Sequence, residues 1–161
     1  TFIYAFLFGA GAKKISTIVG SKDLTLGKKL IDKFLSELPR LKSFRSQLEE
    51  AAQSGKVRGL DGRLFNVRSA HKAVNTIIQG AGAIACKVWL RNMMKHVYKK
   101  GLDVKLIASI HDEYQFEVNK NDIQSMGEVV KLSIKETTEQ LNLKCPLDAE
   151  FKTGSSWADT H

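Results

Sequence analysis

Residues 104–118 read VKLIASIHDEYQFEV, and their pattern indicates two strands joined by a charged turn. Val104–Ile110 is a nearly continuous apolar run rich in β-branched residues, which predicts a buried strand. Residues 114–118 alternate apolar and polar side chains, which predicts a second strand with one apolar face. The tripeptide His111–Glu113 stands between the two runs. We therefore expect three ionisable side chains at the tip of a hairpin.

The rest of the chain adds helices and further strands. Asp61-Gly62, which separates two short apolar runs, is a strong signal for a second β-hairpin. Residues 147–151 predict a third strand for the sheet that begins at residue 104. Apolar residues recur at helical spacing in the segments 26–38, 41–52 and 121–141. Residues 71–100 predict one long helix ended by Gly101, and residues 1–8 the end of a helix followed by a turn. The predicted class is α+β, with helices first and then a small antiparallel sheet backed by helices.

The composition is that of an ordinary globular chain, with 161 residues, 43% of them apolar and 26% charged. This length predicts one compact domain. The apolar stretch Thr1–Ala12 is too short to cross a bilayer, which takes about 20 helical residues, and it has no signal-peptide pattern. Cys86 and Cys145 make neither a disulfide framework nor a zinc site. We expect a cytoplasmic protein with reduced thiols and no membrane partner.

The net charge of +8 is distributed unevenly along the chain. Residues 1–100 carry a net charge of +13, whereas residues 101–161 carry −5. A basic body of this kind favours a polyanionic partner, nucleic acid first, although a solvated lysine surface explains the charge alone equally well. The acidic segment beside it suggests carboxylates kept for a metal ion.

The acids of the 111–113 turn are the candidate chemical centre. Paired carboxylates between apolar strands are costly unless a cation compensates them. Mg²⁺ takes carboxylate and phosphate oxygens together, and phosphoryl-transfer enzymes often place two such ions about 4 Å apart. The alternative is an ordinary hairpin turn that exposes polar side chains.

Several motifs, taken in order, resemble family A (Pol I-like) DNA polymerases. They are residues 1–11 (TFIYAFLFGAG), residues 59–63 (GLDGR), the helix that holds Asn75 and Gln79, and the hairpin with His111–Glu113. The resemblance covers essentially the whole chain and is strongest to the replicative enzymes of short-tailed bacteriophages. It implies a palm-type antiparallel sheet with helices, plus a helical fingers portion. Residues 1–55 correspond to the C-terminal part of the fingers and residues 56–161 to the C-terminal part of the palm.

The resemblance implies roles for the hairpin tip and for one helix face. Asp112 matches the carboxylate that binds the catalytic Mg²⁺ ions, and Glu113 matches its neighbour with a secondary contribution. His111 and Gln79 match residues that contact the duplex minor groove near the primer terminus. Because correct base pairs offer similar acceptors there, such contacts can test pair geometry without reading sequence.

Other matching positions imply contacts with DNA and with the incoming nucleotide. Asn75 lies on the Gln79 face, His71 lies one turn earlier, and Arg63 has a structural or DNA-backbone role. Tyr4 stands where the family has Phe or Tyr facing the sugar, and tyrosine there is associated with poor discrimination against dideoxynucleotides. Phe8 stands where the family usually has tyrosine, so one hydrogen bond is lost. For both aromatics the alternative is core packing.

The resemblance also implies motifs upstream of this sequence. The lysine and arginine that bind the triphosphate precede Thr1 in the family, as does the second metal-binding aspartate. We therefore expect a C-terminal polymerase fragment that is inactive alone and needs an N-terminal polymerase segment, primer-template DNA, deoxynucleoside triphosphates and two Mg²⁺ ions. A single-subunit RNA polymerase fragment is the nearest rival, against which Glu113 and Tyr4 argue. A non-catalytic DNA-binding module is the other alternative.

Overall fold

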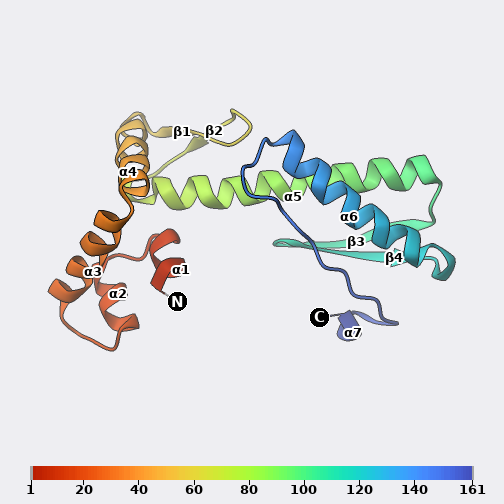
Figure 1. Cartoon of the computed structure of the whole chain (residues 1–161), viewed down its shortest axis with the longest axis horizontal. Helices are drawn as coiled ribbons and strands as arrows, with labels where there is room; N and C mark the ends of the chain where they lie inside the picture. Colours follow the sequence, from red (N-terminus) through yellow and green to blue (C-terminus); the bar gives the residue numbers. More distant parts are fainter. Residues whose placement is uncertain (1, 161) are drawn as a thin grey trace. The chain divides into compact units, whose positions relative to one another are not determined.

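The computed structural model describes residues 2–160, and the chain forms two compact units that meet at Ala81 and Gly82 in the sequence (Figure 1). The first unit contains α1 (Phe2–Leu7), α2 (Ala12–Ile18), α3 (Leu24–Glu37), α4 (Pro39–Ala51), η1 (Ala52–Ser54), β1 (Lys56–Arg58), β2 (Leu64–Asn66) and η2 (Ala70–Lys72). The long helix α5 (Ala73–Lys100) runs through the boundary. The second unit continues with β3 (Val104–Ile110), β4 (Glu113–Val118), η3 (Lys120–Asp122), α6 (Ile123–Gln140) and α7 (Trp157–Thr160). The helices predicted from apolar spacing are confirmed, and α2 is an additional one.

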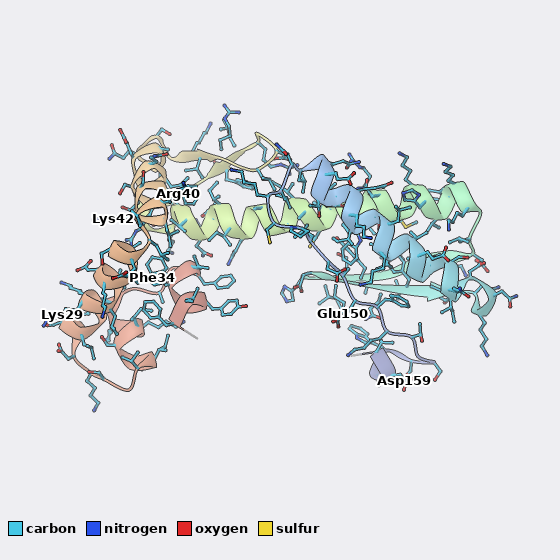
Figure 2. The ribbon with its side chains drawn as sticks, viewed as in Figure 1. Lys29, Phe34, Arg40, Lys42, Glu150 and Asp159 are labelled. Carbon is cyan, nitrogen blue, oxygen red and sulfur yellow. The ribbon has the colours of Figure 1, made fainter. Side chains whose placement is uncertain are left out.

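An aromatic cluster holds the N-terminal helices together. Phe6, Ile15 and Leu35 are buried in it, from α1, α2 and α3. The Phe34 ring of α3 meets the Phe2 and Phe6 rings edge to face, each at a centroid distance of 5.2 Å (Figure 2). Such edge-to-face pairs place the positive ring edge against the negative ring face. The cluster therefore fixes α1 against α3 through the Phe2 and Phe6 side of α1.

The hairpin of β1 and β2 is confirmed, and it is seated on α5 by one ring. The strands pair antiparallel with Val57 opposite Phe65. A Cβ atom added to Gly80 on α5 would lie 2.7 Å from Phe65 Cζ, and one added to Gly59 would also overlap this ring. The two glycines therefore leave the space that the Phe65 ring occupies between the hairpin loop and α5.

We expect Gly80→Ala to destabilise the chain by about 1 to 3 kcal/mol, because the new methyl group must displace an aromatic ring. Gly82→Ala is the matched control, since nothing lies within 4 Å of its added Cβ. Alanine is the better helix former, so this control should be neutral or stabilising by up to about 1 kcal/mol. Urea unfolding of the two variants measures both effects. Equal stability of the two variants would contradict this packing.

The second unit packs β3 and β4 against α5 and α6. Met93 and Val97 of α5 are buried against Met126, Val129 and Val130 of α6. Alternate residues of β4 join the same cluster, namely Tyr114, Phe116 and Val118. Polar contacts also join the two helices, with Asn92 Nδ2 donating to Thr137 Oγ1 at 3.1 Å and His96 Nε2 lying 2.9 Å from Glu136 Oε2. One face of the hairpin is therefore fixed to a solid core.

The predicted strand Val104–Ile110 is confirmed as a strand, but its predicted burial is wrong. Leu106 is 40% exposed and Ile107 is 63% exposed. The register shifts between Leu106 and Ala108, so Ile107 lies in an irregular step of the ladder. Within residues 2–160 this sheet has two strands, and helices pack on one of its faces. The apolar run of β3 is therefore covered on one side only.

The predicted strand 147–151 is also wrong, since these residues form no strand. The backbone N–H of Leu147 donates to Thr138 Oγ1 at 3.0 Å, and that of Ala149 donates to the Asp148 side chain at 2.8 Å. Side-chain oxygens thus accept from the backbone N–H groups that would otherwise donate to a neighbouring strand. The Phe151 ring packs on Gly127 of α6, so closely that a Cβ atom added to this glycine would lie 2.5 Å from the ring. The segment therefore packs along α6 instead of joining the sheet.

By length and apolar composition, α5 also has what a helix needs to cross a membrane. The same properties are found in the core helices of globular proteins. In this structure 17% of the 18-residue apolar window of α5 is buried, and Val74, Ile84, Met93 and Val97 are among the buried residues of the helix.

Candidate functional site

The tip of the β3–β4 hairpin is a tight two-residue turn. Ile110 pairs with Glu113, so only His111 and Asp112 lie between the strands. His111 has a φ of +53°, a left-handed conformation that is uncommon for residues other than glycine. Strained backbone of this kind costs about 1 to 3 kcal/mol and clusters at functional sites. Both turn side chains are exposed.

Asp112 and Glu113 lie in different surroundings. Within residues 2–160, the Asp112 carboxylate accepts no hydrogen bond and joins no ion pair, whereas the half-buried Glu113 accepts a hydrogen bond from Gln115 Nε2. Burial raises the pKa of the Cys86 thiol, and the nearby Asp112 carboxylate raises it further. Cys86 on α5 therefore stands beside the tip, which its apolar sequence context did not indicate.

The tip fits a hard divalent cation as part of a larger ligand set. Carboxylate oxygens are the ligands that Mg²⁺ prefers, and both Asp112 oxygens lack a protein partner among the residues described. No group of three or more His, Cys, Asp or Glu side chains suited to a metal ion occurs within that same part of the chain. The hairpin can thus supply one or two carboxylate ligands.

An open pocket of about 1210 Å³ lies next to the tip in the second unit. The pocket is lined by the two acids of the tip, by β4 and by the C-terminal segment, including Asp112, Glu113, Gln115, Trp157 and Thr160. The residues that surround the carboxylates are therefore drawn from elements far apart in the sequence.

The two aromatics predicted to contact the nucleotide are exposed, Tyr4 on α1 and Phe8 in the turn that follows it. Tyr4 is 71% exposed and Phe8 is 51% exposed. Core packing, the alternative for both, is excluded because Phe6 and its neighbours fill the core instead. One helical turn separates Tyr4 from Phe8, so they share a face.

The predicted DNA-contacting face of α5 lies in the first unit, next to the end of α1. A Cβ added to Gly9 would lie 3.7 Å from Asn75 Cβ, so the turn after α1 touches α5 there. Asn75 Oδ1 is buried without a hydrogen-bond partner among the described residues, so this oxygen is not open to solvent. Gln79 is exposed, one turn further along α5. The side chain of His71 lies outside the description.

Arg63 closes the β1–β2 turn. Its Nη2 lies 2.6 Å from Asp61 Oδ2, and its Nε donates to the same carboxylate. The hydrogen bond from Arg63 lowers the pKa of the Asp61 carboxyl, and in return the pKa of Arg63 is raised. This pair is exposed, so it shapes the turn more than it stabilises the fold. The contact with Asp61 gives Arg63 a structural part in the turn.

The candidate residues thus form two groups. Tyr4, Phe8, Arg63, Asn75 and Gln79 belong to the first unit, whereas His111, Asp112 and Glu113 belong to the second. Gln115 was missed from the sequence, although its position two residues after Glu113 on a strand places both side chains on one face. Thr160 carried no signal, because it meets Gln115 across 45 residues of sequence.

Known proteins resemble this chain over most of its length. A sequence model of DNA polymerase family A matches residues 1–159. The DNA-directed DNA polymerase of Escherichia phage Phieco32 is 36% identical over 168 residues, covering 100% of this chain and 27% of the phage protein. That of Escherichia phage T7 is 34% identical over 183 residues, covering 100% of this chain and 26% of its own. DNA polymerase I of Bacillus subtilis (strain 168) is 32% identical over 143 residues, covering 80% of this chain and 16% of its own.

The fold agrees with these matches. The POL domain of Pol1 from M. smegmatis, solved in complex with DNA primer-template and dNTP, superimposes with a TM-score of 0.74 at 18% identity. The match covers 84% of this chain and 26% of that one. The chain spans about a quarter of the length of its phage relatives. It belongs to DNA polymerase family A.

Proposed function

We propose that this chain is the C-terminal part of a template-directed DNA polymerase that extends a primer by two-metal nucleotidyl transfer. The observation that carries the proposal is the unpartnered Asp112 carboxylate beside Glu113, at the tip of a strained hairpin in a family A chain. Residues 1–55 would be the C-terminal part of the fingers, and residues 56–161 that of the palm.

Asp112 would hold Mg²⁺, with a secondary contribution from Glu113. The bound ions would neutralise charge on the attacking and leaving oxygens. Tyr4 on α1 and Phe8 just after it would face the incoming nucleotide, since both side chains are exposed. His111 and Gln79 would contact the minor groove at the primer terminus. Asn75 and His71 would approach the duplex from the same helical segment, and Arg63 would have a structural or DNA-backbone role.

The remaining parts of the machinery would come from an N-terminal polymerase segment. That segment would supply the second carboxylate and the cationic side chains that bind the triphosphate. The lack of a third metal ligand among the described residues supports this division of labour. The phage relatives suggest that the complete enzyme works in the cytoplasm of a bacterial host.

Primer extension tests the proposal. The chain is assayed alone and together with the upstream segment of its polymerase, with Mg²⁺ and either deoxy- or ribonucleoside triphosphates. We expect deoxynucleotide incorporation only in the mixture. Extension by the chain alone would contradict the divided site, and preferred ribonucleotide incorporation would favour an RNA polymerase. DNA binding without extension in any sample would favour a non-catalytic binding module.

A further inference from the structure

A chain of hydrogen-bonding groups leads from the C-terminal helix to the hairpin tip. Gln115 follows Glu113 by two residues on β4, and its Nε2 donates to a Glu113 carboxylate oxygen. At the other end of the same amide, Gln115 Oε1 lies 3.4 Å from Thr160 Oγ1 on α7. The Gln115 amide therefore stands between a tip carboxylate and the last helix.

The turn before α7 fixes the place of Thr160. The Asp159 carboxylate accepts from the backbone N–H groups of Ser155 and Ser156 and from the Ser155 hydroxyl, each at 2.9 Å (Figure 2). These bonds lower the pKa of Asp159, so the carboxylate stays charged and keeps accepting. The Thr160 hydroxyl also lies 3.0 Å from the Trp157 carbonyl oxygen, so its single proton is shared between that oxygen and Gln115 Oε1.

A neutral amide suits this position for an electrostatic reason. The terminal torsion of a Glu side chain is broad, so a free carboxylate samples many orientations. A hydrogen bond from an amide fixes the orientation without adding a positive charge that would compete with a cation. Hydrogen-bond partners of metal-site carboxylates typically change metal affinity by about 10- to 100-fold when they are removed.

We propose that Gln115 is a positioning residue that orients Glu113 at the tip, and that Thr160 of α7 holds the Gln115 amide in place. The consequence for metal binding rests on the proposed function of the tip. The C-terminal segment then acts on the site through Gln115 and contributes no ligand of its own from its described residues.

The contacts themselves are tested by the side-chain amide signals of Gln115 in a ¹H–¹⁵N spectrum of the 161-residue chain. Gln115→Met, which keeps the length of the side chain, identifies these signals by their loss. We expect Glu113→Gln and Thr160→Val to shift them, and Thr160→Ser to leave them near their original position. Thr153→Val is the matched control, because Thr153 lies in the same exposed segment without a hydrogen bond to Gln115. Shifts from Thr160→Val no larger than those from Thr153→Val would overturn the proposal.

The consequence is tested by Mn²⁺ binding to the chain combined with the upstream segment of its polymerase, measured by the electron paramagnetic resonance of free Mn²⁺. Gln115→Met is expected to raise the apparent dissociation constant about 10-fold. Adding Thr160→Val to it should change nothing further, because the two residues act in series. If Asp112→Asn abolishes Mn²⁺ binding while Gln115→Met leaves it intact, the positioning role of Gln115 is wrong and the proposed metal site stands. If Asp112→Asn leaves Mn²⁺ binding unchanged, the proposed metal site is wrong and the positioning role is lost with it.

Discussion

Asp112→Asn is expected to lower primer extension by the complete polymerase about 1000-fold while primer-template affinity stays the same. The substitution keeps the shape of the side chain and removes the charge that would hold the metal ion. Metal ions stabilise transition-state charge by several kcal/mol, and each 1.36 kcal/mol is a factor of ten in rate. Single-nucleotide incorporation under rapid mixing, with DNA affinity measured separately by fluorescence anisotropy, checks both parts of the prediction.

Asp103→Asn is the matched control for this experiment. It makes the same change of charge on an exposed aspartate at the other end of the hairpin, just before β3. We expect nearly full activity from it. If Asp112→Asn retained a tenth of the rate, or if both variants lost activity equally, the assignment of Asp112 would be wrong.

Met93→Ala is expected to destabilise the chain by about 2 to 5 kcal/mol. Met93 is fully buried where α5 meets α6 and β4, so truncation leaves a cavity in the centre of the second unit. Met93→Leu nearly conserves volume and should cost less than about 1.5 kcal/mol. Chemical denaturation followed by circular dichroism measures both values. A loss below about 1 kcal/mol for Met93→Ala would show that this cluster is not the core that supports the hairpin.

The elements that the sequence predicted are those whose signals are local. Helical spacing located α3, α4 and α6, and Asp61-Gly62 located the turn between β1 and β2. Pro39 begins α4, because proline fits the first helical turn. The helix α2 escaped prediction, since its seven residues are too few for a clear period.

The two errors concern tertiary context. An apolar run at 104–110 predicts a strand well but says nothing about what covers each face, and here one face is partly exposed. Residues 147–151 have the composition of a strand, but Thr138 and Asp148 capture their backbone donors first. Neither outcome can be deduced from the pattern of the segment itself.

The candidate site was predictable where its residues are adjacent. Asp112 and Glu113 are neighbours in a turn, so the sequence placed them together at the tip. The contact between Gln115 and Thr160 joins residues 45 positions apart, and only the course of the C-terminal segment brings them together. Asn75 was predicted to share a face of the helix with Gln79, but the burial of its Oδ1 depends on packing that no sequence pattern describes.

The most direct test of the central claim is to locate the metal ion chemically. Fe²⁺ is added in place of Mg²⁺ with ascorbate and peroxide, so that hydroxyl radicals cut the backbone next to the bound ion, and the fragments are identified by mass. The account predicts a cut at residues 111–113 that excess Mg²⁺ suppresses and that Asp112→Asn removes. A cut elsewhere in the chain, or one at the tip that neither Mg²⁺ nor Asp112→Asn affects, would contradict a metal site at this hairpin.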